Sequence, residues 1–93
     1  KKANIYFDGK CVSHTILLPN GTRSTVGVIF PSTLTFNTQA AEVMEILAGH
    51  CRVKLQGASD WNEYKEDQKF SVPANSSFEI ETSDTLHYVC HFE

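Results

Sequence analysis

Histidine is the side chain of this sequence best suited to bind a metal ion, and the chain has four, at positions 14, 50, 87 and 91. His87 and His91 are four residues apart, a spacing that would place both on one face of a helix. On a strand the same spacing separates them by about 13 Å, too far for one ion. His14 and His50 have no neighbouring ligand in the sequence, so we expect no histidine metal site. The sequence also contains no hydrolase elbow, metalloprotease helix or phosphate-binding glycine loop.

The elements that must position any site are predicted to be strands, because apolar and polar residues alternate along the chain. The apolar members of these alternating segments are Leu34 and Phe36, then Cys51, Val53 and Leu55, then Phe78 and Ile80, and finally Leu86, Tyr88, Cys90 and Phe92. His87 and His91 fall on the opposite, solvent-facing side of the last segment. Residues 26–30 form a continuous apolar run closed by Pro31, which predicts a strand buried on both faces.

Turn-forming residues separate the predicted strands. Residues 19–22 (Pro-Asn-Gly-Thr) predict a hairpin, and Asn20-Gly21 suits a type I′ turn. Residues 39–47 have apolar positions that would also suit a short helix, but a helix here would break the strand rhythm. About eight to ten short strands predict an all-β sandwich or barrel.

Composition limits the chain to one domain, residues 1–93, with 41% apolar and 20% charged residues. The net charge is −3 and the basic residues are scattered, so we expect no nucleic-acid partner. No stretch approaches the roughly 20 apolar residues of a membrane span, so we expect no membrane partner. The three cysteines are far apart and form no CxxC pair, which argues against a disulfide framework and favours a reducing cytoplasm.

Residues 35–42, followed by Gly49, resemble the first cupin motif, and Pro73 stands in a stretch that resembles the second. The resemblance implies a single cupin-type jelly-roll barrel with Glu42 pointing inward. The positions of the three metal-binding histidines of cupins are occupied by Phe36, Thr38 and Phe78. One carboxylate alone does not hold a transition metal, so the resemblance is to a metal-free cupin.

Further segments run through nearly the whole chain, from about residue 6 to residue 92. They are Tyr6-Phe7-x-Gly9-Lys10, Arg23-x-x-Val26-Gly27-Val28, Thr35-Phe36-x-Thr38, Glu42-x-Met44, Asp60-Trp61-x-x-Tyr64, Phe70-x-Val72-Pro73 and Tyr88-x-Cys90. Their order and spacing are similar to the small single-domain pyrimidine/purine nucleoside phosphorylase family. The chain departs from that pattern at Asp67, which is usually Gly, at Asn75 in the second cupin turn, and at His91, where Arg is common.

The resemblance implies phosphorolysis, in which a purine or pyrimidine nucleoside and phosphate give ribose 1-phosphate and free base. It implies a pentosyltransferase that needs no metal or organic cofactor, and a homodimer. Within this reaction Arg23 and Glu42 are the expected catalytic residues. A phosphate dianion calls for cations and hydroxyls, and the candidates are Arg23, Lys10 and Thr38. Nucleoside binding is assigned to a carboxylate for the ribose hydroxyls and to aromatic rings, namely Glu42, Trp61, Tyr64 and Tyr88.

A second reading from another class stays open. The same pocket would serve a non-catalytic cupin that binds a nucleoside or a sugar. Release of base that requires both protein and phosphate distinguishes the phosphorylase from this binding protein.

Overall fold

The computed structural model describes residues 2–93 and confirms the all-β prediction. The elements are β1 (Asn4–Tyr6), η1 (Phe7–Gly9), β2 (Cys11–Leu17), β3 (Arg23–Ile29), β4 (Ser32–Asn37), β5 (Glu42–Ala48), β6 (His50–Leu55), β7 (Asn62–Lys65), β8 (Lys69–Val72), β9 (Ser77–Thr82) and β10 (Leu86–Phe92). No helix among residues 2–93 is long and apolar enough to cross a membrane.

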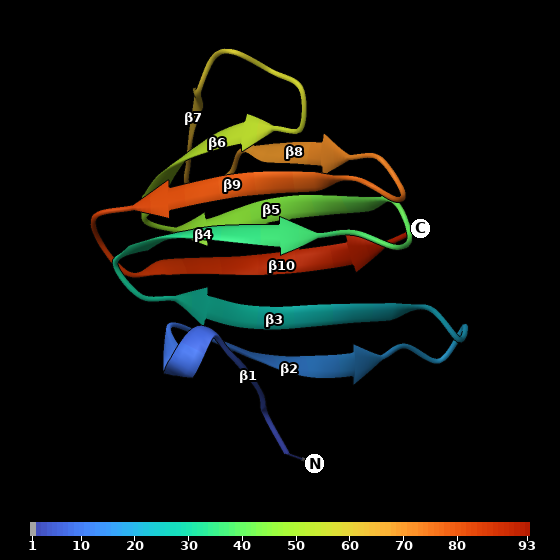
Figure 1. The fold of residues 1–93 in the computed structure, drawn as a ribbon. Coiled ribbons are helices and arrows are strands. Elements are labelled where there is room, and N and C mark those ends of the chain that lie inside the picture. The colour runs from blue at the N-terminus through green and yellow to red at the C-terminus, as the bar shows by residue number, and fades with distance from the viewer. Residues whose placement is uncertain (1) are drawn as a thin grey trace.

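The strands form two antiparallel sheets that face each other. The larger sheet has the order β1-β2-β3-β10-β5-β8, and the smaller has the order β4-β9-β6-β7. In Figure 1 the smaller sheet lies over the part of the larger one that contains β5, β8 and β10, while β1 and β2 extend beyond it. Within residues 2–93 no strand pairing joins the two sheets, so the molecule is a two-layered jelly roll rather than a closed barrel.

The core lies between the layers and uses alternate residues of their strands, as the period of two predicted. The larger sheet contributes Cys11, Ile29, Met44, Ile46, Phe70, Val72, Leu86, Tyr88 and Cys90, and the smaller contributes Leu34, Cys51, Val53, Phe78 and Ile80. Full burial of each large apolar side chain stabilises the fold by about 1.5–3 kcal/mol. The inner face of the sheets is therefore fixed by hydrophobic packing.

The strand expectation for the region 39–47 holds, because β5 begins at Glu42 and continues through Ala48. The prediction of a type I′ turn at Asn20-Gly21 is wrong. Gly21 alone of the Asn20-Gly21 pair has a positive φ, +86°, and the Leu18 N–H donates to the Thr22 carbonyl across a three-residue loop. Such a loop accommodates the strand twist with one left-handed residue, whereas type I′ requires two.

The expectation that residues 26–30 are buried on both faces is also wrong. Val26 and Val28 are only partly buried, and Phe30 is 42% exposed. Only one side of β3 faces the smaller sheet, so the valines lie on the outer face of the larger sheet. Around them lies a shallow hollow of about 300 Å³, lined by Val12, His14, Val26, Gly27, Val28, Leu47 and His87.

The three cysteines are unpaired and buried, with exposed fractions of 0% for Cys11, 2% for Cys51 and 4% for Cys90. Burial raises the pKa of the Cys51 thiol to about 11. It raises the pKa of the Cys90 thiol to about 12, and the neighbouring Glu42 carboxylate adds to this rise. All three thiols are therefore protonated at neutral pH.

Candidate functional site

Arg23, Phe92 and Glu42 lie side by side on three adjacent strands of the larger sheet. Strand β10 pairs with β5 so that Phe92 is opposite Glu42, and it pairs with β3 so that His91 is opposite Ser24. The next position along β3 is Arg23, whose guanidinium carbon lies 4.5 Å from the centre of the Phe92 ring. The strand register thus brings a cation and a carboxylate, distant in sequence, to one end of the inner face.

Two adjoining cavities open beside this row. The first, which we call the aromatic cavity, has a volume of about 230 Å³ and is lined by Tyr6, Ser13, Thr25, Phe36, Asn37, Glu42, Met44, Phe78, Tyr88, Cys90 and Phe92. The second, the arginine cavity, measures about 340 Å³ and is lined by Arg23, Asn37, Thr38, Gln39, Ala40, Glu42 and Phe92. Both share Asn37, Glu42 and Phe92 as a common wall. Together they fall within the roughly 300–1,000 Å³ of small-molecule sites.

Arg23 is exposed and lines the arginine cavity, and its guanidinium donates no hydrogen bond to any group of residues 2–93. The ion pairs among residues 2–93 are Arg52–Glu81, Lys54–Glu79 and His91–Glu45, and none of them includes Arg23. The Phe92 ring supports the guanidinium through a cation–π contact and leaves its edge available. A guanidinium in this state is suited to bind two oxygens of an anion at once.

Glu42 is half-buried and belongs to both cavities. Burial raises the pKa of its carboxyl group, and a hydrogen bond with Cys90 partly opposes the rise. A carboxylate that has lost part of its hydration gains more from a hydroxyl donor than an exposed carboxylate does. Glu42 is therefore placed to accept hydrogen bonds from a polyhydroxylated ligand that spans the two cavities.

Tyr88 lines the aromatic cavity and is buried, with 5% of its surface exposed. Its hydroxyl is 3.4 Å from the Cys11 Sγ, and burial raises its pKa. Gly27 makes room for this hydroxyl, since a Cβ at that position would lie 2.9 Å from it. Tyr88 thus lines the cavity with an anchored, neutral hydroxyl.

Thr38 lines the arginine cavity, but its hydroxyl is already engaged. The Oγ1 donates to the Pro73 carbonyl at 2.7 Å and accepts from the Ser76 N–H at 2.9 Å. These bonds fasten the end of β4 to the loop between β8 and β9. A phosphate contact through this hydroxyl proton would require the bond to Pro73 to break.

The structure places Lys10, Trp61 and Tyr64 outside both cavities. Lys10 follows η1, and its carbonyl accepts a hydrogen bond from the Phe30 N–H at 2.8 Å. Tyr64 comes from β7 and packs on Phe70 with the ring centres 4.9 Å apart. The sequence showed that these residues have suitable side chains for binding phosphate or a base. It did not show where they lie, because that depends on how the two sheets pack.

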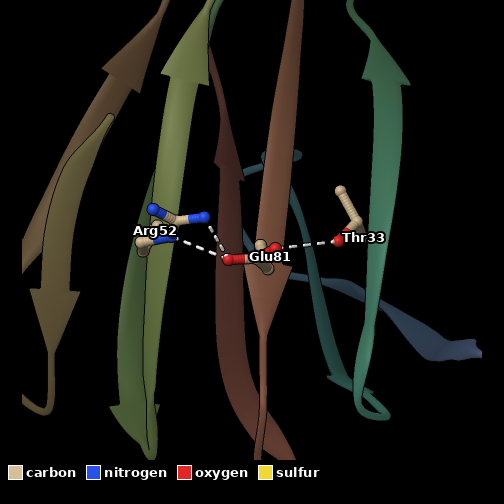
Figure 2. Close-up of polar contacts among 3 residues, drawn as sticks. All are labelled: Thr33, Arg52 and Glu81. Atoms are coloured by element: carbon tan, nitrogen blue, oxygen red, sulfur yellow. Dashed lines mark hydrogen bonds and ion pairs between the residues drawn. The ribbon is translucent and has the colours of Figure 1, made fainter. Parts of the chain in front are cut away.

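Trp61 lies beside the outer face of the smaller sheet, where Arg52 sits 4.7 Å from its ring centre. Figure 2 shows the same face, with Glu81 of β9 between Arg52 of β6 and Thr33 of β4. The Arg52 Nε donates to Glu81 at 2.7 Å, and the Thr33 hydroxyl donates to it at 3.2 Å. The ligand-binding capacity of Arg52 is therefore largely consumed within the sheet.

Two hollows of about 500 and 600 Å³ on this side of the molecule are larger than the cavities at Arg23. Both are lined by Arg52, whose charge is neutralised by Glu81. The cavities at Arg23 are smaller, but they combine a half-buried carboxylate with a cation that forms no ion pair in the described part of the chain. We therefore regard them as the candidate active site.

Metal binding, common in cupins, does not fit the residues present. The cavities offer Glu42 as their one carboxylate, and phenyl rings from Phe36 and Phe78 where cupins carry ligands. Among residues 2–93 no group of three or more His, Cys, Asp or Glu side chains could hold an ion. His91 lies on the outer face, where its Nε2 is 3.1 Å from Glu45.

From the sequence we did not identify several residues that line the aromatic cavity, namely Tyr6, Ser13, Thr25, Asn37, Cys90 and Phe92. Alternation did place Cys90 and Phe92 on the same face as Tyr88, so that signal was sufficient to find them. Tyr6 and Ser13 required knowledge of where β1 and β2 join the sheet, which the local pattern does not contain.

Solved structures with the same fold are numerous. The chain is 48% identical to a protein of unknown function from Acinetobacter sp. ADP1, with a TM-score of 0.98 over 100% of this chain and 90% of that one. It also resembles the cupin domain of Schizosaccharomyces pombe Cnp3, with a TM-score of 0.68, 14% identity, and coverage of 89% of this chain and 61% of that one. The second likeness shows a cupin-like fold and nothing about activity.

Relatives found by sequence comparison share a higher identity with the chain than these solved structures do. The chain is 70% identical over 92 residues to a pyrimidine/purine nucleoside phosphorylase from Herminiimonas arsenicoxydans, covering 99% of this chain and 88% of the relative. It is 68% identical over 93 residues to one from Methylobacillus flagellatus, covering 100% and 90% respectively. The family model for pyrimidine/purine nucleoside phosphorylases matches residues 1–92. The chain therefore belongs to the pyrimidine/purine nucleoside phosphorylase family.

Proposed function

We propose that the two adjoining cavities are the phosphorolysis site, with phosphate in the arginine cavity and the nucleoside in the aromatic cavity. The activity itself follows from family membership: the protein is a nucleoside phosphorylase, a pentosyltransferase acting on nucleoside and phosphate. The observation that supports the location is the row formed by Arg23, Phe92 and Glu42 at the wall between the cavities.

Arg23 binds the phosphate dianion in this proposal. One phosphate oxygen attacks C1′ of the ribose and forms the new C–O bond. The C1′–N bond breaks, and its electron pair leaves with the base. Overall, the base gains the proton that hydrogen phosphate loses when it becomes the sugar phosphate. The sugar passes through an oxocarbenium-like state, so a correctly placed anion and preorganised charge supply most of the rate enhancement.

Glu42 orients the ribose by accepting hydrogen bonds from its hydroxyls. Its place between the cavities sets the sugar against both the phosphate and the base, and its negative charge favours the cationic character that develops on the sugar. Lys10, Trp61 and Tyr64 are not part of this arrangement within one chain.

The deciding experiment follows uridine and inosine conversion at several phosphate concentrations. In Arg23→Met a hydrogen bond to a charged group is lost, worth about 1.5–3 kcal/mol, so kcat/KM for phosphate falls about tenfold to hundredfold. Arg52→Met, which removes a cation paired with Glu81 on the outer face, is the matched control and keeps its phosphate kinetics. Phosphate-independent release of base would contradict the reaction. Unchanged phosphate kinetics in Arg23→Met would contradict the site alone.

The proposal includes a homodimer joined through the outer face of the larger sheet. Val26, Val28 and Leu47 are apolar and only partly buried there, with Leu47 42% exposed. A second copy of the same face covers these side chains and enlarges the small core of a 93-residue domain. We place the protein in the cytoplasm, supported by the three unpaired thiols, which suit a reducing compartment.

A further inference from the structure

The segment that follows β1 takes an unusual path. Phe7, Asp8 and Gly9 have φ values of 53°, 55° and 91°, which are three successive left-handed conformations. A bulky aromatic residue at positive φ is a rare outlier, and such strain is concentrated at ligand sites. The question is therefore which side chains this strained path positions.

The turn brings two consecutive aromatic side chains to the same side of the sheet. In an extended strand Tyr6 and Phe7 would point to opposite faces. Here Tyr6 lines the aromatic cavity, and the Phe7 ring packs edge-on against Phe36, with the centres 5.2 Å apart and the planes at 79°. Phe36 lines the same cavity, so the contact fixes the turn against the cavity wall.

The other rings of the cavity already have partners. Phe36 and Phe78 stack on each other at 5.5 Å and 20°. Arg23 covers one face of Phe92, and the buried Tyr88 holds its hydroxyl against Cys11. These rings are committed to the core or to the guanidinium.

Tyr6 differs from all of them. It is 47% exposed, and no ring–ring or cation–π contact within residues 2–93 includes it. It lies on β1, a three-residue edge strand that pairs with β2 alone. Tyr6 thus offers a ring that lines the aromatic cavity and is also half exposed to solvent.

We propose that Tyr6 is the residue on which the nucleobase stacks when a nucleoside occupies the aromatic cavity. The inference rests on the proposed function and assigns to Tyr6 the contact that the sequence assigned to Trp61 and Tyr64. Stacking uses the π-face that every base possesses, so one ring serves purines and pyrimidines alike. The left-handed turn at Phe7 holds the ring over the cavity.

The test measures binding of inosine and uridine by calorimetry without phosphate, using the full chain. Loss of the ring in Tyr6→Leu weakens binding of both nucleosides about 5- to 150-fold, the range of one base–aromatic stack. Tyr6→Phe and Tyr6→Trp keep an aromatic face and bind within a few-fold of the wild type. Ile5→Ala, a neighbouring change at a side chain that is 67% exposed, leaves binding unchanged and is the matched control.

Two measurements separate the possible failures. A Tyr6→Leu variant, or a Tyr6→Ala variant with the wild-type melting temperature, that binds both nucleosides as the wild type does overturns the role of Tyr6. Wild-type protein that binds nucleosides but does not convert them with phosphate overturns the proposed function. In that case the binding of the Tyr6 variants still decides whether the base stacks on Tyr6. Wild-type protein that binds neither nucleoside overturns both.

Discussion

Glu42 stands at the wall between two cavities, and its environment sets a conflict between stability and function. Half-burial penalises its charged form and raises its pKa, while the hydrogen bond from Cys90 compensates only in part. A residue selected for folding alone would be neutral here. The proposed function accounts for the retained carboxylate, because ribose hydroxyls require an acceptor.

Replacing the carboxyl group with an amide makes the conflict measurable. We expect Glu42→Gln to lose nucleoside turnover and yet to melt at a higher temperature than the wild type at pH 7, because the desolvation of a charge is removed. A raised folded-state pKa means that the wild-type penalty is fully present above that pKa and disappears below the unfolded value of about 4.5.

The stability gain should therefore shrink as the pH falls toward 4, which thermal melts of both proteins across this range can follow. Equal melting temperatures at pH 7, or a gain that is the same at pH 4, would contradict the assignment of the strain to the Glu42 charge.

At the scale of the element, turns carry most of the departures from an ideal backbone. Asp67 and Asn75 have φ values of 71° and 53°. The resemblance to the family implies Gly at position 67, and Asn75 lies in the stretch that resembles the second cupin turn. Only glycine adopts this conformation without a steric cost, although Asp and Asn tolerate it better than other residues do.

Glycine at these two turns should stabilise the protein. We expect Asp67→Gly and Asn75→Gly each to raise the free energy of unfolding by up to about 1 kcal/mol, measured by urea denaturation. Gly57→Ala is a control in the opposite direction. The φ of Gly57 is +81° and a Cβ there would meet no atom within 4 Å, so any loss of stability comes from backbone strain alone. Destabilisation by both glycine substitutions would show that the side chains contribute more than the strain costs.

Gly27 illustrates the other use of glycine, at a strand interior. A Cβ at Gly27 would lie 2.6 Å from the Val12 carbonyl oxygen and 2.9 Å from the Tyr88 hydroxyl. We expect Gly27→Ala to cost about 1–3 kcal/mol of stability through overpacking. In a double-mutant cycle with Tyr88→Phe the two effects should be non-additive, because removal of the hydroxyl relieves one clash. Additive costs would mean that the strain falls on β2, through the Val12 carbonyl and the Ser13 Cβ, rather than on Tyr88.

The strands were predictable from the sequence because alternation is a local signal that burial enforces. Leu86, Tyr88 and Cys90 face the core as their spacing indicated, and Glu42 and Arg23 reach one site. What the sequence could not supply was the pairing of distant strands. That pairing carries Trp61 to the outer face and Tyr6 to the cavity, and it leaves one face of the valine-rich β3 uncovered within the chain.

That uncovered face leads to a prediction for the whole molecule. Light scattering at micromolar concentration should give twice the 10.4 kDa of the chain. Val28→Lys, on the outer face of the larger sheet, should shift the population toward the single chain because it places a charge among apolar side chains. Thr35→Lys, an equivalent charge on the exposed outer face of the smaller sheet, should not. A wild-type mass near that of one chain would contradict the dimer.

The buried Cys11 thiol gives the protein a built-in reporter of local opening. Cys11 lies on β2, which is paired on both sides by β1 and β3, and it is 0% exposed and lines none of the cavities described above. An alkylating reagent reaches it only when the surrounding sheet transiently separates, so its labelling rate is set by a local opening equilibrium. Oxidants are subject to the same barrier, and chemical damage at this sulfur would therefore follow partial unfolding rather than precede it.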